Sequence, residues 1–399
     1  MKRNLLPTLM FMVLLSPLAI DIYLPSMPMM ATDYGVSHNQ VQSTLVLFLF
    51  ALGVGQILIG PLADRYGRRP IALFGIVLYG LSSWAGAVAE NFEVLQLVRV
   101  LQGIGACSTS IVVFSAVRDC YNSKESVPLY SYLNGAICVI PALAPTFGGV
   151  LAMHFGWRST FIFMSLYAVL VAAVVILRFP ETRPANTDSS GPLYRWHRYK
   201  PVLSDGQFVF YAGACMIGMA SILTYVSYSS IWLIGHLHLS KLAFSGLFAL
   251  NASVNLVACF SAPKLVKKIG NRPSVIMALV LMLLAAILEA LLQLFGPQAG
   301  MPAALGFMLP MILLCVGFAI LLGPATSMAL SGFGERAGTA AAMLGFIQMS
   351  GASVLTAVIQ LTPITAPWAV VVVLGCTSTL YLVLMVMPQL KHCHQEKHG

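Results

Sequence analysis

The sequence predicts an all-α integral membrane protein with twelve transmembrane helices in two six-helix bundles. Of the 399 residues, 58% are hydrophobic and 9% are charged, and a soluble core of this size cannot bury so much apolar surface. The apolar residues form runs of about 20 residues, which is the length a helix needs to cross a bilayer. One long polar segment near the middle of the chain separates these runs into two sets of six.

Each apolar run is assigned to one span because it is long enough and carries few charges. The predicted spans are 7–29, 40–63, 70–89, 94–117, 130–153, 159–179, 207–234, 242–263, 273–295, 303–330, 336–361 and 365–388. The first run follows Lys2 and Arg3, as in a signal peptide. However, it continues through Asp21 to Pro25 without a cleavage site of small residues, so we expect a retained first helix.

The basic residues lie where membrane topology requires them. All but three of the 22 Lys and Arg residues fall in alternate connecting segments, and the exceptions are Arg99, Arg158 and Lys241. Basic loops stay in the cytoplasm, so both termini are predicted to be cytoplasmic. The same distribution explains the net charge of +9 without a nucleic-acid partner.

The eight cysteines are scattered and show no paired spacing. We therefore expect no disulfide, no metal site and no cofactor. His392 and His394 flank Cys393 near the carboxyl terminus, and a short polar tail at the bilayer explains them better than a set of metal ligands.

The polar segment divides the chain into an amino-terminal bundle (1–180), a cytoplasmic linker (181–206) and a carboxyl-terminal bundle with a short tail (207–399). A weak repeat supports this division, because GRRP at 67–70 is echoed by GNRP at 270–273 after the corresponding span. The echo is imperfect in charge, since Lys267 stands where the first half has Asp64.

Four motifs indicate a family. The segment GPLADRYGRR (60–69) resembles the signature G-x-L-A-D-R-x-G-R-R/K of the major facilitator superfamily. RVLQGIGA (99–106) resembles the fourth-helix motif R-x-x-Q-G-x-G-A of proton-driven members, and PTFGG (145–149) resembles the fifth-helix antiporter motif, with Ala144 in place of its leading glycine. DIYLPSMP (21–28) narrows the resemblance to twelve-helix drug:proton antiporters of the Bcr/CflA type.

This resemblance implies alternating access and proton-coupled efflux of small amphipathic compounds, phenicol or bicyclomycin-like, across a bacterial inner membrane. We expect a monomer whose partners are the small-molecule substrate, protons and the lipid bilayer. The alternative is an exporter of one native metabolite, such as a siderophore or a sugar. An enzyme is not expected, because the sequence has no catalytic constellation, no G-x-S-x-G motif and no phosphate-binding loop.

Two ionisable residues within the spans are the proton-coupling candidates. Asp21 lies in the first helix, where a carboxylate is costly unless it is paired, hydrated or protonated. We expect its protonation to compete with substrate binding, while the alternatives are a cap at a helix break near Pro25 or a place at the outer interface. Arg99 belongs to the proton-coupling machinery in the resembling family, with a snorkelling side chain as the alternative. Asp21 is expected to lie near Arg99 and Gln102.

A second group of charged residues is expected to act as a conformational gate. Asp64 is predicted to meet the amino end of the eleventh helix near Glu335 and Arg336. Arg65 or Arg68 is predicted to pair with Asp119. Such contacts can hold one side of the protein closed and break when it opens. The gate residues are Asp64, Arg65, Arg68, Arg118 and Asp119.

The remaining candidates bend a helix or line the substrate cavity. Prolines and glycines in the fifth span lower helicity and permit either bending or close packing; they are Pro141, Pro145, Gly148 and Gly149. Polar and aromatic residues that share helix faces would suit a drug-like ligand. The cavity candidates are Tyr23, Gln102, Tyr225, Tyr228, Trp232, Asn251, Asn255 and Gln348. Glu289 is either interfacial or part of a substrate entrance.

Overall fold

The computed structural model describes residues 5–121, 123–184, 193–194, 196–333 and 336–387. The chain divides into two compact units, unit 1 (residues 1–195) and unit 2 (residues 196–399). The described residues contain helices and connecting loops but no strand. Among them, twelve helical segments are long and apolar enough to cross a membrane, six in each unit. The predicted fold class is therefore confirmed, while the boundaries of the linker remain a prediction.

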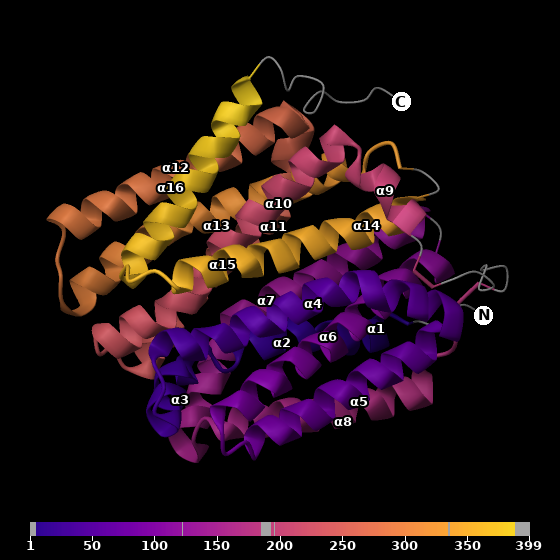
Figure 1. Cartoon of the computed structure of the whole chain (residues 1–399), viewed down its shortest axis with the longest axis horizontal. Helices are drawn as coiled ribbons and strands as arrows, with labels where there is room; N and C mark the ends of the chain where they lie inside the picture. The colour runs from indigo at the N-terminus through magenta and orange to yellow at the C-terminus, as the bar shows by residue number, and fades with distance from the viewer. Residues whose placement is uncertain (1–4, 122, 185–192, 195, 334–335, 388–399) are drawn as a thin grey trace. The chain divides into compact units, whose positions relative to one another are not determined.

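Unit 1 is built from one interrupted helical span followed by five continuous ones (Figure 1). Its helices are α1 (Leu6–Val13), α2 (Leu15–Asp21), the short 3₁₀ turn η1 (Leu24–Ser26), α3 (Met27–Tyr34), α4 (His38–Tyr66), α5 (Arg68–Ala87), α6 (Phe92–Cys120), α7 (Ser123–Phe155) and α8 (Arg158–Arg178).

The interruption in the first span follows from its sequence. Pro25 lies inside η1 and cannot donate a backbone hydrogen bond, and the α-helix resumes only at Met27. The segment from Leu6 to Tyr34 still counts as one membrane span. The predicted helix 7–29 is therefore a chain of short helices, with Asp21 at the last residue of α2.

Local caps fix where other helices begin. A capping box starts α4, in which Ser37 Oγ accepts from the Gln40 backbone N–H at 3.3 Å and the Gln40 side chain accepts from the Ser37 N–H at 2.8 Å. In unit 2, the Asp205 and Ser240 side chains each accept one backbone N–H at the start of α10 and α11.

Unit 2 has six spans after one short helix. Its helices are α9 (Trp196–Leu203), α10 (Gly206–Ser230), the π-helical turn η2 (Ile231–His236), α11 (Lys241–Ile269), α12 (Asn271–Phe295), α13 (Gly300–Leu330), α14 (Ala337–Phe346), the π-helical turn η4 (Ile347–Gly351), α15 (Ala352–Gln360) and α16 (Ala366–Val386). Helix α9 lies within the segment that the sequence analysis reads as a polar linker, and its Val202 is fully buried.

The two halves share one backbone feature at the predicted repeat. Gly67 joins α4 to α5 with a φ of 103°, and Gly270 joins α11 to α12 with a φ of 88°. Both angles lie in a region that favours glycine. The GRRP and GNRP segments therefore make the same kind of sharp turn after corresponding spans.

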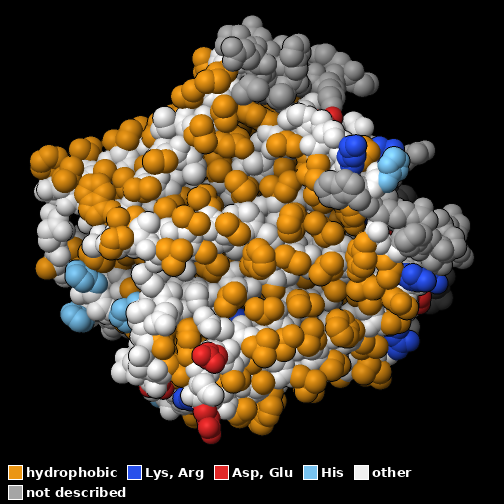
Figure 2. Space-filling view, in the orientation of Figure 1, with side chains coloured by type: hydrophobic (Ala, Val, Ile, Leu, Met, Phe, Trp, Pro, Cys, Tyr) orange, Lys and Arg blue, Asp and Glu red, His pale blue; other side chains and the backbone are white. Residues whose placement is uncertain are grey.

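The outer surface of the helices is suited to lipid. Figure 2 shows mostly hydrophobic side chains facing the viewer, while most of the charged and histidine side chains lie near the edges of that face. Large exposed residues such as Leu81, Leu177 and Phe295 are 65%, 74% and 83% accessible, which is expected where the solvent is a bilayer.

Candidate functional site

Asp21 lies inside unit 1 at the point where the first span is interrupted. It is the last residue of α2 and is only 4% exposed. Among the described contacts, its carboxylate receives no hydrogen bond and no ion pair. A carboxyl group in such a place is costly as an anion unless water, a cation or a proton joins it. Asp21 is therefore a buried carboxyl group without a described partner, a position that does not favour the interfacial alternative.

Helix α7 packs tightly against this break. A Cβ atom on Gly148 would lie 1.7 Å from the Ile22 carbonyl oxygen, so only glycine permits this approach. Gly149 is buried beside it. The helix itself runs without interruption from Ser123 to Phe155, through Pro141 and Pro145. The motif thus brings α7 to the residue next to Asp21, while bending of α7 stays a prediction.

Arg99 on α6 is fully buried and is surrounded by neutral groups. Its Nη2 donates to the Ala19 carbonyl at 3.0 Å, its Nε donates to the Thr44 carbonyl at 3.3 Å, and its Nη1 donates to the Gln102 side-chain oxygen. The guanidinium carbon also lies 4.6 Å from the Tyr23 ring centroid and 4.5 Å from that of Phe48. This set of contacts rules out the snorkelling alternative.

Gln102 extends these contacts towards α5 and α8. Its Nε2 donates to Ser83 Oγ at 2.8 Å and approaches Met164 Sδ at 3.5 Å, while Ser83 donates to the Tyr79 carbonyl at 2.7 Å. Tyr23 shares a 3.4 Å hydrogen bond with Thr44. We call Tyr23, Thr44, Ser83, Arg99 and Gln102 the Arg99 cluster, and it links the first span to α4, α5, α6 and α8.

Two glycines of the RVLQGIGA motif make this arrangement possible. A Cβ on Gly103 would lie 2.3 Å from the Phe48 carbonyl oxygen of α4. A Cβ on Gly105 would lie 2.7 Å from the Gly75 carbonyl oxygen of α5. Helix α6 therefore packs backbone to backbone against both neighbours, which brings Thr44 and Ser83 within reach of Arg99 and Gln102.

The expectation that Arg99 is a partner of Asp21 needs a correction. The guanidinium contacts the carbonyl of Ala19, two residues before Asp21, and no described ion pair joins the two charged groups. The physical reason is that two backbone carbonyls, one amide oxygen and two ring faces already satisfy the cation. Arg99 thus holds the end of α2 in place and leaves the Asp21 carboxyl unpaired.

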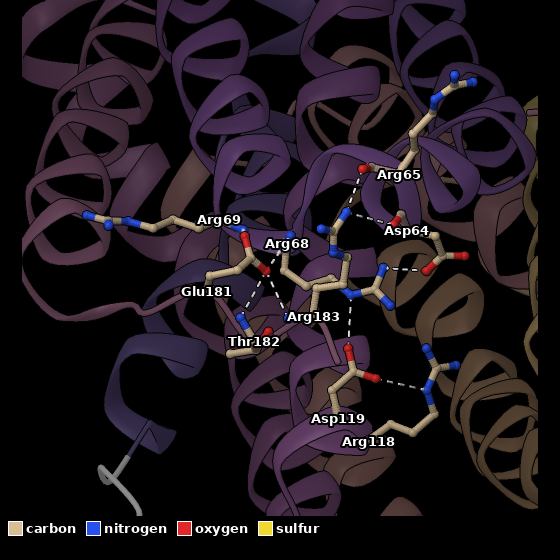
Figure 3. A network of polar contacts seen from close by, with 9 residues as sticks. All are labelled: Asp64, Arg65, Arg68, Arg69, Arg118, Asp119, Glu181, Thr182 and Arg183. Atoms are coloured by element: carbon tan, nitrogen blue, oxygen red, sulfur yellow. Dashed lines mark hydrogen bonds and ion pairs between the residues drawn. The ribbon is translucent and has the colours of Figure 1, made fainter. Parts of the chain in front are cut away.

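The predicted gate residues of unit 1 come together beside the α4–α5 turn (Figure 3). Arg68 Nη1 lies 2.7 Å from Asp64 Oδ1 and its Nε lies 2.9 Å from Asp119 Oδ2, while Arg118 Nε lies 3.5 Å from Asp119 Oδ1. The Arg68 and Asp119 side chains are 3% and 5% exposed, whereas Asp64 remains 47% exposed. Arg68, not Arg65, is therefore the residue that pairs with Asp119.

Two residues of this region were missed by the sequence analysis. The Glu181 carboxylate accepts from the backbone N–H groups of Arg68 at 2.8 Å and Arg69 at 3.2 Å, at the amino end of α5. Arg183 Nη1 donates to the carbonyls of Asp64 at 3.3 Å and Arg65 at 2.5 Å, at the carboxyl end of α4. Their order, an acid and then a cation two residues apart directly after a span, was the signal available in the sequence.

Glu181 is held as a carboxylate by these bonds. Partial burial acts to raise its pKa, but the N–H groups of Arg183, Arg68, Arg69 and Thr182 together outweigh burial and leave the pKa below its ordinary value. An acid at a helix amino end is also favoured by the helix dipole. Glu181 and Arg183 thus fasten the α4–α5 turn to the end of α8. The proposed counterpart of Asp64 near Arg336 belongs to unit 2, and Glu335 lies outside the described residues.

Two of the cavity candidates in unit 2 bind each other instead. Asn251 Nδ2 donates to Tyr225 Oη at 3.2 Å and to the Met308 carbonyl at 3.0 Å. The Tyr225 ring stacks on Phe248 with centroids 5.8 Å apart. Both polar groups are buried and satisfied by neighbouring helices, which is typical of hydrogen bonds that join helices in membranes.

Tyr228 and Trp232 do not share the contacts of Tyr225. Helix α10 gives way to the π-helical turn η2 after Ser230, which changes the register at Trp232. Tyr228 and Trp232 pack together against Ala366 and Ala369, away from the Tyr225 contacts. Trp232 also stacks on His236 with ring centroids 4.3 Å apart.

The last two candidates are partly exposed. Asn255 on α11 lies 4.0 Å from Cys259 Sγ through its side-chain oxygen. Gln348 lies in η4, the second π-helical turn of unit 2. Such turns widen a helix locally and are frequent at functional sites, so both residues stay candidates.

The helices and the buried charges together define a polytopic membrane transport protein with two six-helix units. Residues 9–356 match the profile of the Major Facilitator Superfamily, and the chain belongs to this family. It is 30% identical over 375 residues to multidrug resistance protein MdtL of Shewanella oneidensis, covering 94% of this chain and 93% of that protein. It is 32% identical over 383 residues to a chloramphenicol resistance protein of Pseudomonas aeruginosa, covering 95% and 89%.

Solved structures share the fold at low identity. A D-xylose–proton symporter aligns with a TM-score of 0.73 and 17% identity over 97% of this chain and 98% of that one. A peptide transporter in complex with sulfate aligns with a TM-score of 0.73 and 16% identity over 96% and 92%. The chain is thus a transporter of this fold and not an enzyme.

Proposed function

We propose that this protein exports small amphipathic compounds, phenicol or bicyclomycin-like, in exchange for protons by alternating access. Its similarity to multidrug and chloramphenicol resistance proteins supports the substrate class. The observation that carries the coupling is the buried, unpaired Asp21 carboxyl at the break in the first span. Export of one native metabolite by the same mechanism is the second candidate, and a panel of drug susceptibilities compared with metabolite secretion separates the two.

In this proposal Asp21 carries the proton and Arg99 is the positioning residue. Protonation makes Asp21 compatible with its apolar surroundings, and loss of the proton leaves an anion that water or a polar substrate must stabilise. Because Arg99 holds the Ala19 carbonyl, a change at the end of α2 is passed to α4 and α6 through the same guanidinium. Through these contacts of Arg99, a change in charge at Asp21 can cause a shift of the neighbouring helices.

Asp64, Arg68, Arg118 and Asp119 are proposed to stabilise one closed state. Arg68 is the central cation because it meets both carboxylates, and the half-exposed Asp64 retains an oxygen free of that contact for a group on another helix. Breaking the Arg68–Asp64 pair, whose carboxylate is half-exposed, costs little, about 1 kcal/mol or less. This suits a contact that must open in every cycle, whereas the buried Arg68–Asp119 pair suits a contact that stays closed.

The orientation and assembly state are also proposals. Basic loops on one side support cytoplasmic termini, and the bacterial source of the relatives supports a bacterial inner membrane. Both six-helix units lie in one chain, which supports a functional monomer. Fusion of a reporter that is active only in the cytoplasm to the carboxyl terminus should give an active reporter, and an inactive fusion with a working transporter would contradict this topology.

The function is tested in inside-out membrane vesicles energised with a proton gradient. Labelled chloramphenicol should accumulate, and collapse of the gradient should abolish the accumulation. The Asp21→Asn variant should accumulate no more drug than vesicles without transporter, although it inserts normally. Glu90→Gln is the matched control because that carboxyl is exposed, and it should transport as the unmodified protein does. Gradient-driven accumulation by Asp21→Asn would refute the role of Asp21.

A further inference from the structure

A second acidic residue is buried within unit 2. Glu289 lies on α12 and is 0% exposed, on the helix face that also carries the buried Met282, Ala285 and Ala286. It precedes the helix end at Phe295 by six residues, or roughly 9 Å at about 1.5 Å per residue. This burial does not favour an interfacial residue, while a place at a substrate entrance stays a prediction.

The carboxyl group of Glu289 is only half satisfied. Its Oε1 accepts from Gln293 Nε2 at 2.9 Å, one turn along the helix. Its Oε2 is buried, and no hydrogen-bond partner reaches it among the described residues. A buried oxygen without a donor is rare in proteins and calls for a physical explanation.

No cation on the packed helices compensates the carboxyl group. Helices α13 and α16 pack against α12 and contain no Asp, Glu, Lys, Arg or His at all. Their titratable groups are Cys315, Cys376 and Tyr381. Cys376 is exposed and Tyr381 donates to the Phe210 carbonyl, so neither serves Glu289.

The way the helices pack places the remaining titratable groups away from Glu289. Gly317 on α13 lies against Ala278 and Met282, so Cys315, two residues before Gly317, lies towards the middle of α12. Helix α11 also contacts α12. Its Lys264, Lys267 and Lys268 lie near the turn at Gly270, which is the opposite end of α12 from Glu289, and Cys259 lies one to two turns before them. Lys241 begins α11, and no described ion pair joins it to Glu289.

A charged carboxylate in these surroundings would be unpaired and desolvated, which is strongly unfavourable. The neutral acid removes this cost, and its proton belongs on Oε2 because Oε1 already accepts from Gln293. We propose that Glu289 is a second proton-binding site, separate from Asp21 and located in the other unit. Protonation of Glu289 stands by itself, whereas its part in drug exchange rests on the proposed function.

Infrared difference spectroscopy of the full chain in detergent tests the protonation without any drug. A protonated carboxyl absorbs apart from the amide bands, and carbon-13 labelling of glutamate shifts that band for Glu but not for Asp. The intact protein should show a protonated Glu band at neutral pH, and Glu289→Gln should lose it. Glu93→Gln, which removes an exposed carboxyl, should retain it. Absence of a label-sensitive band in the intact protein would overturn the proposal without any variant.

The alternative is that Glu289 binds a cationic compound, which would displace the proton. If Glu289 binds only a proton, adding tetraphenylphosphonium at constant pH should leave the Glu band unchanged. Loss of the band would contradict the proposal and assign the carboxyl to a cationic substrate.

A second experiment, drug transport into membrane vesicles, measures the number of protons exchanged for each drug molecule. The logarithm of steady-state drug accumulation should vary with the pH difference across the vesicle with a slope of about 2 in the intact protein and about 1 in Glu289→Gln. An unchanged slope in an active variant would exclude Glu289 from exchange. Failure of the proposed function looks different, because no accumulation would then be driven by the gradient in either protein.

Discussion

Arg99 brings a permanent positive charge into the interior of unit 1, and its surroundings supply dipoles and ring faces instead of a carboxylate. A guanidinium can serve several acceptors at once because its donors point in fixed directions. This explains why the family motif uses arginine at this place. It also explains why Asp21, two residues after the Ala19 carbonyl that Arg99 contacts, is left without an ion pair, as the proposed proton site requires.

Replacing Arg99 with lysine tests this explanation. Lys keeps the charge but cannot reach Ala19, Thr44 and Gln102 together, so at least one buried acceptor loses its donor at about 1–3 kcal/mol. We expect a lower midpoint of thermal unfolding in detergent and drug binding that no longer depends on pH. Arg118→Lys is the control because that side chain is 56% exposed, and it should change stability by no more than about 0.5 kcal/mol. Unaltered stability and pH dependence in Arg99→Lys would contradict the positioning role.

Glu181 provides a prediction about acid. Because its pKa is lowered in the folded protein, the stability it contributes is fully present above the ordinary value of 4.5 and is lost as the pH falls through the folded value. Glu181→Gln should therefore lower the unfolding midpoint at neutral pH, by about 1 kcal/mol in free energy for a helix cap. The difference from the intact protein should shrink in acid. Thermal unfolding in detergent at a series of pH values measures this, and a difference that grows in acid would contradict it.

At the scale of helices, close backbone contacts decide where the site residues meet. The charged motifs could be read from the sequence because each contains an ionisable residue in an apolar context. The partners of Arg99 and Gln102 could not, since Thr44 and Ser83 are common polar residues whose roles depend on how α4 and α5 pack against α6. The π-helical turn at Ile231–His236 was likewise invisible, because helical periodicity assumes a constant number of residues per turn.

Gly103→Ala tests the packing of α6. The added Cβ would lie 2.3 Å from the Phe48 carbonyl, and α4 must move to relieve it. We expect a loss of about 1–3 kcal/mol in stability and a reduced transport rate. Gly306→Ala is the matched control, since nothing lies within 4 Å of its added Cβ. Equal stability of the two variants in thermal unfolding would show that the close approach of α4 and α6 is not required.

At the scale of the whole molecule, the fold followed from the sequence because membrane spans are long apolar runs, and basic residues give a topology that can be tested. The interruption of the first span was anticipated only as an alternative, through Pro25. The acid and the cation at Glu181 and Arg183 were visible directly after the sixth span, but their contacts were not, because these depend on the turn at Gly67. The repeat was visible as GRRP and GNRP, and the positive φ of both glycines gives it a structural meaning.

The most direct test of proton-coupled exchange measures proton release from the detergent-solubilised protein on addition of chloramphenicol in weakly buffered solution. The intact protein should release protons in a saturable manner, because drug binding and protonation of Asp21 exclude each other. The Asp21→Asn variant should still bind the drug by calorimetry but release fewer protons than the intact protein, and Glu289→Gln should still release the proton of Asp21. Undiminished proton release from Asp21→Asn would contradict the account.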